Sequence, residues 1–233
     1  MDMRGARILV PGATGQLGAA LVTRLHALGA RPALAGRNPD ALARVSALCG
    51  GAPARTFDAW DLDRCALTVH WAETELGGLD GVVVCLGVAA FGPAPEISDA
   101  VAEHLTAVNA LAPMAFLRAA APRIGEGGAL AAVTGVVAEA APAGMADYAA
   151  AKAALATWLT AVRREQRRSG VSVLEINLPH MDTGFAQRAV HGQAPHLPQG
   201  LPVEDAVDAV VAALSDGARL VRPGTVAPLE VVR

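Results

Sequence analysis

The chain has 233 residues, of which 53% are hydrophobic and 18% charged, and its formal net charge is −3 at pH 7. This is the length of one large domain with a substantial core, and the composition excludes extensive disorder. The one basic run, Arg163–Arg168, ends a helical pattern, where positive charge suits the helix dipole. We therefore expect no nucleic-acid binding.

The cysteines and histidines follow no ligand pattern. The three cysteines lack a CxxC spacing, which indicates free thiols in a reducing compartment, and the six histidines form no HExxH-like pattern. No signal-peptide pattern begins the chain, and no apolar run reaches membrane-spanning length without a charge, glycine or proline. We expect a cytoplasmic protein with no metal site and no membrane partner.

Runs typical of strands alternate with longer runs typical of helices. In chain order, strands are predicted over 6–10, 31–36, 54–58, 81–87, 128–135 and 171–177. Helices are predicted over 19–29, 38–50 (entered through Asn38), 63–76, 99–120, 145–168 and near Glu204–Leu214, with a short strand at the end. The alternation predicts an α/β fold with a doubly wound parallel sheet, a Rossmann fold, in a single domain over 1–233.

The regular alternation fails between Pro179 and Pro202, where four prolines and three glycines occur. This stretch follows the carboxyl end of a strand, the edge at which open α/β sheets bind ligands. We expect a substrate loop over about 180–202, and the alternative is a plain surface connection.

A glycine loop lies between the first strand and the first helix. Gly12, Gly15 and Gly18 permit a tight turn, a close approach of the backbone to a pyrophosphate, and close packing of the helix on the strand. Phosphates would then lie at the amino end of the helix, where free N–H groups favour an anion. The position of the loop predicts a dinucleotide site.

The end of the second strand indicates which nucleotide binds. NAD-binding chains tend to carry an acidic residue there, whereas an arginine accommodates a 2′-phosphate. Here Gly36 and Arg37 occupy this place, and Arg7 could add positive charge. We expect NADP(H) rather than NAD(H), and the alternative for Arg37 is an ordinary solvated arginine.

The only tyrosine and the only lysine of the chain, Tyr148 and Lys152, are four residues apart. On a helix they share a face, and an ammonium near a phenol lowers the phenol pKa. Such a tyrosine can exchange a proton with an alcohol or carbonyl oxygen. The alternative is a surface pair on an alanine-rich helix.

With these features the chain resembles the short-chain dehydrogenase/reductase family along nearly its whole length. The resemblance is carried, in order, by the glycine loop, Asp58 in TFDAWD, VVVCLGVAAFGP with Gly87, Asn109 in HLTAVNAL, Tyr148-x3-Lys152, and NLPHMDTGF after the sixth strand.

The resemblance implies roles for these residues. Tyr148 would be the acid/base, Lys152 would bind the nicotinamide ribose and lower the phenol pKa, and Asn109 would hold a water of a proton relay. Asp58 would meet the adenine amino group. The candidate cofactor-binding residues are Gly12, Thr14, Gln16, Leu17, Gly18, Arg37, Asp58, Gly87, Tyr148, Lys152, Pro179, Met181 and Thr183.

The chain departs from the family at the catalytic serine, which normally lies thirteen residues before the tyrosine. That position is Gly135, and the hydroxyl of neighbouring Thr134 is expected to point to the other face. The usual NNAG is Val84-Cys85-Leu86-Gly87, the phosphate loop has Gln16 as its middle residue, and His180 follows Pro179, with Thr183 one residue early.

Two hypotheses remain. The first is an NADP(H)-dependent carbonyl reductase or alcohol dehydrogenase in which water, Thr134, His180 or the substrate replaces the serine. The second is a protein with non-redox activity (isomerase, dehydratase or cyclase) or a non-catalytic nucleotide sensor. The retained Tyr148, Lys152 and Asn109 favour the first. We expect a small-molecule substrate in an aliphatic pocket, and the resemblance implies a homodimer or homotetramer.

Overall fold

All 233 residues are described by a computed structural model, which contains one eight-stranded sheet. The strands are β1 (Arg7–Pro11), β2 (Arg31–Gly36), β3 (Ala54–Thr56), β4 (Gly81–Val84), β5 (Ala129–Val133), β6 (Ser172–Ile176), β7 (Leu220–Pro223) and β8 (Leu229–Val232). The helices are α1 (Gln16–Ala27), α2 (Pro39–Leu48), α3 (Leu62–Leu76), α4 (Asp99–Thr106), α5 (Ala112–Ala120), α6 (Val137–Ala140), α7 (Ala146–Glu165) and α8 (Val203–Asp216).

The strand order is β3-β2-β1-β4-β5-β6-β7-β8, with every pair parallel except β7–β8. The chain first moves outward from β1 to β3 and then returns to the other side of β1, so the order reverses between β1 and β4. Open α/β sheets bind ligands at such a reversal, outside the carboxyl ends of the strands. The predicted doubly wound parallel sheet is confirmed; the single final strand is wrong, because the chain ends in the β7–β8 hairpin.

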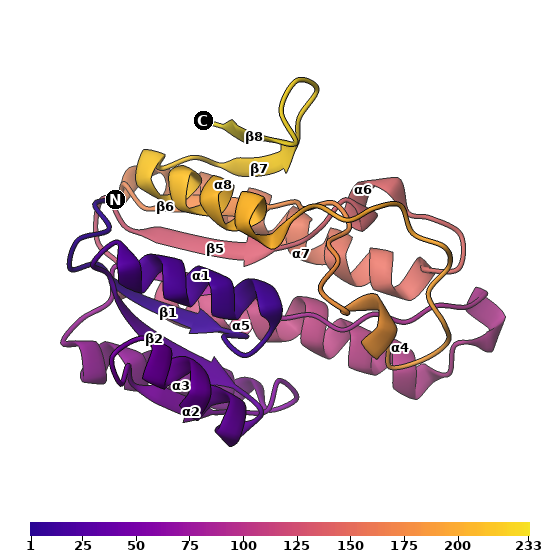
Figure 1. The fold of residues 1–233 in the computed structure, drawn as a ribbon, viewed down its shortest axis with the longest axis horizontal. Coiled ribbons are helices and arrows are strands. Elements are labelled where there is room, and N and C mark those ends of the chain that lie inside the picture. Colours follow the sequence, from indigo (N-terminus) through magenta and orange to yellow (C-terminus); the bar gives the residue numbers. More distant parts are fainter.

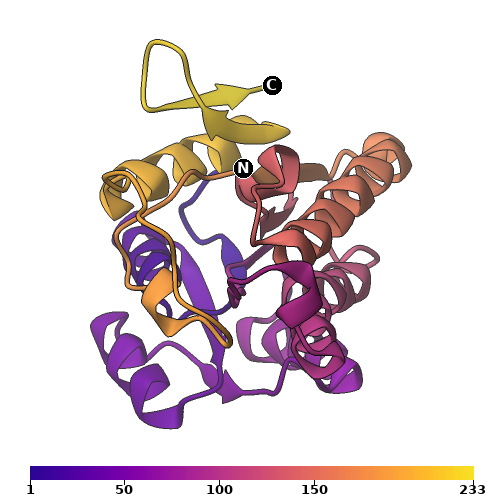
Figure 2. The ribbon, with the colours of Figure 1, turned by 90° about the vertical axis from the view of Figure 1, so that its right-hand side faces the viewer.

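Helices cover both faces of the sheet and enclose two hydrophobic cores (Figures 1 and 2). One core packs α1, α2 and α8 against one face, and the other packs α3, α5 and α7 against the opposite face. In Figure 1 the arrows of β1, β5 and β7 point to the right, toward the segment between β6 and α8. Figure 2 looks onto that carboxyl edge.

Side-chain caps begin several of these helices. Asn38 accepts a hydrogen bond from the Ala41 N–H at 2.9 Å and Asp61 accepts one from the Arg64 N–H at 2.9 Å, which satisfies backbone donors at the starts of α2 and α3. By contrast, α1 begins at Gly15 without a side-chain cap. Its first N–H groups are therefore left for another partner.

The predicted helix over 99–120 is interrupted. A π-helical turn, Ala107–Leu111, separates α4 from α5, and π turns are frequent at functional sites. Asp99–Ala120 as a whole is long and apolar enough to cross a membrane by length and composition, and 56% of its most apolar window is buried in the fold. Buried core helices share these properties.

Candidate functional site

The glycine loop after β1 is built so that only glycine fits at its ends. Gly12 has φ +89°, and a Cβ added there would lie 2.5 Å from the carbonyl oxygen of Cys85. A Cβ on Gly18 would collide with the carbonyl oxygen of Gly12. The backbone can therefore turn tightly into α1, whose first turn contains Gln16 and Leu17 and whose uncapped N–H groups face the loop.

The end of β2 packs closely on this loop and places positive charge beside it. A Cβ on Gly36 would lie 3.1 Å from both Cγ2 and Oγ1 of Thr14, so the two segments are in contact. The next residue, Arg37, is exposed and makes no hydrogen bond or ion pair within the chain. A free guanidinium at this position suits a phosphate on the nucleotide ribose.

The suggestion that Arg7 adds charge to the nucleotide site is wrong. Arg7 is the first residue of β1, at the end opposite to the glycine loop, and its guanidinium binds Asp80 at 2.8 and 2.6 Å. This pair holds the pKa of Asp80 below its usual range and links β1 to the segment before β4. Arg7 is therefore a structural residue.

Asp58 lies after β3 on the same carboxyl edge. It is exposed, and its Oδ1 accepts a hydrogen bond from the Trp60 N–H at 3.0 Å. Its other oxygen has no partner within the chain, which leaves an acceptor for the amino group of a base.

Tyr148 and Lys152 are both buried on one face of α7, with 9% and 2% exposure. The Lys152 Nζ donates hydrogen bonds to the carbonyl oxygens of Val133, at 2.9 Å, and Leu86, at 3.3 Å. Val133 is the last residue of β5, and Leu86 follows β4, the strand that borders the reversal in strand order. The predicted sharing of a helix face is thus confirmed, and the alternative of a surface pair is excluded.

The expected lowering of the phenol pKa is not what the structure shows. Burial raises the pKa of Tyr148, because the phenolate would lose its hydration. Burial also lowers the pKa of Lys152 to about 8. The Lys152 ammonium is directed to backbone carbonyls rather than to the phenol, and the nearby Cys85 is a neutral thiol whose pKa burial raises to about 12. The tyrosine is consequently a protonated acid at neutral pH.

Asn109 lies in the π-helical turn and is completely buried. Its Oδ1 accepts from the Val88 N–H at 3.1 Å, and its Nδ2 donates to the carbonyl oxygens of Val88 and Leu105 at 2.9 Å. The side chain fixes the segment after β4, and a Cβ on Gly87 would lie only 3.4 Å from Asn109 Oδ1. Both Nδ2 hydrogens and one acceptor site of Oδ1 are thus used within the chain, and the relay role stays a prediction.

The backbone at the position of the family's serine is specific for glycine. Gly135 has φ +104°, a conformation that side-chain-bearing residues rarely adopt. As expected, Thr134 points away: its hydroxyl is buried and donates to Glu175 Oε1 at 2.9 Å on the neighbouring strand. Thr134 therefore cannot supply the missing donor in this conformation.

The segment after β6 brings the last candidates to the same edge. Pro179 and Met181 are half-buried, and Thr183 is buried with its hydroxyl at 3.5 Å from the Met181 carbonyl oxygen, a weak contact. Sequence reasoning missed Phe185, whose ring centroid lies 6.3 Å from that of Tyr148. No spacing rule marks a lone phenylalanine in a long loop, so only the fold could reveal it.

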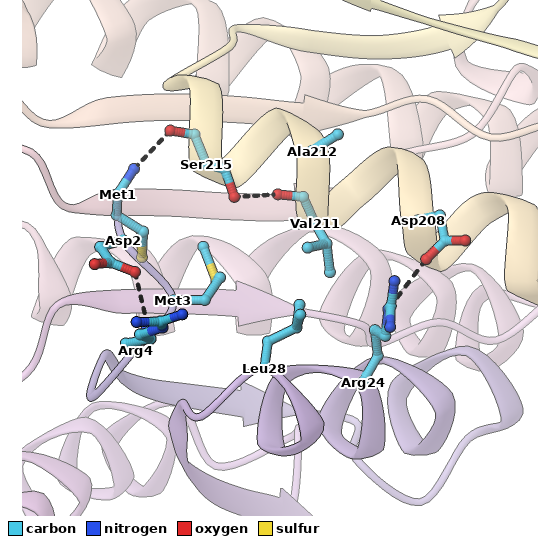
Figure 3. Close-up of a pocket in the computed structure, with 10 residues that line it drawn as sticks. All are labelled: Met1, Asp2, Met3, Arg4, Arg24, Leu28, Asp208, Val211, Ala212 and Ser215. Carbon is cyan, nitrogen blue, oxygen red and sulfur yellow. Dashed lines mark hydrogen bonds and ion pairs between the residues drawn. The ribbon is translucent and has the colours of Figure 1, made fainter.

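A separate depression lies away from this edge, between the first four residues, α1 and α8 (Figure 3). Arg24 and Asp208, which form an ion pair at 3.1 Å across it, are about half exposed. It contains none of the predicted site residues and no cluster of perturbed ionisable groups. The carboxyl edge of the sheet therefore remains the candidate site.

Known proteins resemble this chain in sequence over most of its length. A family model described as short chain dehydrogenase matches residues 6–194. A protein of Escherichia coli K12 described as a cyclic-di-GMP-binding biofilm dispersal mediator is 30% identical over 180 residues, covering 77% of this chain and 74% of that protein.

Solved structures with bound cofactor share the fold. A short chain dehydrogenase from Burkholderia cenocepacia J2315 in complex with NADP has 25% identity and a TM-score of 0.82, over 97% of this chain and 100% of that one. BdcA in complex with NADPH has 26% identity and a TM-score of 0.80, over 92% and 88% of the two chains. The chain belongs to the short-chain dehydrogenase family.

Proposed function

We propose that the protein is an NADP(H)-dependent oxidoreductase that transfers hydride between the nicotinamide and a carbonyl or alcohol substrate. The observation that carries this proposal is the buried Tyr148–Lys152 face of α7, set against the carbonyl oxygens at the ends of β4 and β5. A protein that only binds a nucleotide has no need to bury an ionisable pair there.

The residues present fit the cofactor. The glycine loop has no room for a side chain at Gly12, the start of α1 leaves N–H groups for a pyrophosphate, and Arg37 is unpaired. NADPH would supply the hydride that reduces the carbonyl carbon. The preference for NADP(H) over NAD(H) rests on Arg37 and on the absence of an acidic residue at the end of β2.

The electrostatics support the reductive direction. A phenol whose pKa is raised by burial keeps its proton at neutral pH, and Tyr148 can therefore donate that proton to the carbonyl oxygen as the hydride adds to carbon. Lys152, with a pKa of about 8, is close enough to neutrality to return a proton to the site after each turnover. Oxidation would require the phenolate, which burial disfavours.

Gly135 leaves the reacting oxygen without the family's hydroxyl donor. The loss of one such donor typically costs about a hundredfold or more in rate. We expect a slow enzyme, or one whose substrate carries its own donor next to the carbonyl group.

The test is NADPH oxidation with a panel of ketones and aldehydes by the wild type and by Tyr148→Phe, which removes only the hydroxyl. The proposal predicts turnover by the wild type and a loss of about a hundredfold or more in Tyr148→Phe, measured for both proteins at saturating NADPH. Turnover that survives Tyr148→Phe would contradict the assigned acid.

A second candidate function is nucleotide sensing without net redox chemistry. It is favoured by Gly135 and by the relative described as binding cyclic-di-GMP. Calorimetric titration with cyclic-di-GMP, alone and in the presence of saturating NADP+, tests it. Micromolar binding that NADP+ blocks, together with no NADPH oxidation on any carbonyl compound, would favour the sensor over the reductase.

A further inference from the structure

The loop between β6 and α8 is hydrogen-bonded to the segment that follows β4. The Val190 N–H donates to the Ala89 carbonyl oxygen at 2.8 Å, and the Phe91 N–H donates to the His191 carbonyl oxygen at 3.0 Å. Gly192, at φ +68°, allows this pairing, because a Cβ there would collide with the Phe91 carbonyl oxygen. The loop and the segment after β4 are therefore paired through their backbones.

A third, small hydrophobic core lies beneath this pairing, separate from the two cores of the sheet. Ala89, Phe91 and Ala186 are buried at its centre, with exposures of 1%, 5% and 4%. Partly buried apolar residues surround them: Met145, Phe185, Ala189, Ala194 and Leu197. Two of the four phenylalanines of the chain gather here, so the small core is aromatic as well as aliphatic.

Phe185 joins this core to the reacting groups. Its ring centroid lies 6.3 Å from that of Tyr148, and a Cβ on Gly87 would lie 3.4 Å from its Cε2 atom. Met145 precedes Tyr148 by about one helical turn and packs on the same small core. A carbonyl compound within reach of the Tyr148 hydroxyl would therefore place the rest of its body against Phe185 and Met145.

Asp182 and Arg188, the charged side chains of the loop, make their hydrogen bonds within the loop itself. Asp182 binds the His180 ring at 3.1 Å and the Gly200 N–H at 3.0 Å, and Arg188 is exposed and donates to the Thr183 carbonyl oxygen at 3.2 Å. Of the other two histidines, His196 is exposed and the His191 ring lies beside Gly92. Phe185 and Met145 are apolar, and a substrate carboxylate packed against them would lose its hydration.

Resting on the proposed reductase function, we propose that the site takes uncharged, apolar ketones and aldehydes and rejects carbonyl compounds that carry a carboxylate. The apolar body packs on Phe185 and Met145, the carbonyl oxygen takes the Tyr148 proton, and the carbonyl carbon takes the hydride of NADPH, which leaves as NADP+. Phe185 and Met145, at the edge of the small core, form the specificity surface.

The test compares methyl 7-oxooctanoate with 7-oxooctanoate, which share one skeleton and differ in charge. Binding of each is measured by calorimetry with and without saturating NADP+, and turnover is measured by NADPH oxidation. We expect the ester to bind about 100-fold more tightly than the acid and to have a correspondingly higher kcat/KM. Comparable affinity for the two compounds, or no measurable binding of the ester, would overturn the inference.

Substitutions at Phe185 and Arg188 test whether Phe185 binds the apolar body of the substrate. Phe185→Ala should weaken ester binding roughly tenfold and Phe185→Leu only two- to threefold, each with unchanged NADPH affinity. Arg188→Ala is the matched loop control and should change neither compound by more than about twofold. An Arg188→Ala effect confined to the acid would overturn the inference, because it would identify a carboxylate partner. Ester binding without NADPH oxidation would contradict the reductase function and leave the apolar site standing.

Discussion

Replacing Lys152 by methionine should remove a rise in the free energy of unfolding that the wild type shows as the pH increases from about 8 to 10. A fall in the pKa of Lys152 from 10.5 to about 8 means that burial disfavours its ammonium by about 3 kcal/mol. Between these two pH values the unfolded chain binds more protons than the folded one, so stability rises with pH. Below pH 8 the folded wild type carries the whole penalty.

Methionine has a similar length and no charge, and Lys152→Met therefore removes that penalty. It also removes two charge-assisted hydrogen bonds, to the Val133 and Leu86 carbonyl oxygens, worth about 1.5 kcal/mol each. At pH 7 the two effects should largely offset each other, and the variant and the wild type should have similar stability. Between pH 7 and pH 10 the wild type should gain about 2 to 3 kcal/mol relative to the variant.

Urea unfolding followed by tryptophan fluorescence at several pH values measures both quantities. Groups other than Lys152 titrate in both proteins and largely cancel in the difference. Parallel pH profiles for the two proteins would refute the reasoning, because they would show that the Lys152 ammonium is not desolvated in the folded chain.

Four further substitutions test the nucleotide site and the missing serine. Gly12→Ala should abolish measurable NADPH binding or lower the free energy of unfolding by more than about 2 kcal/mol. Gly15→Ala is the control: its Cβ would meet nothing closer than 3.5 Å, and it should lower the free energy of unfolding by less than about 1 kcal/mol. Arg37→Ala should weaken NADPH binding tenfold or more in fluorescence titrations and leave NADH binding unchanged. Thr134→Val should lower the free energy of unfolding by about 1 kcal/mol and change kcat by less than about threefold; a hundredfold loss would make Thr134 the serine's replacement.

The sheet and the nucleotide loop could be predicted because they depend on local pattern. The strand at Gly81–Val84 is wholly apolar, since both faces are covered, and Gly12 is required by a contact that any dinucleotide loop of this kind makes. The i, i+4 spacing likewise placed Tyr148 and Lys152 on one face without knowledge of the fold.

The details that set the chemistry could not be read in this way, because they arise from packing between distant segments. Burial, and not the neighbouring lysine, decides the pKa of Tyr148, and burial depends on what the loop and α7 enclose. Arg7 lies near the glycine loop in sequence but at the opposite end of β1, where it forms an ion pair with Asp80. The role of Phe185 requires the loop to return to the segment after β4, and no local signal predicts that contact.

The most direct test of the account is deuteride transfer from NADPH labelled at C4 to the ketone carbon of methyl 7-oxooctanoate, followed by mass spectrometry of the alcohol. The account predicts deuterium on the carbinol carbon with the wild type, and about a hundredfold less product with Tyr148→Phe at equal NADPH occupancy. Full NADPH occupancy without deuterium in any product, or equal transfer by Tyr148→Phe, would contradict it.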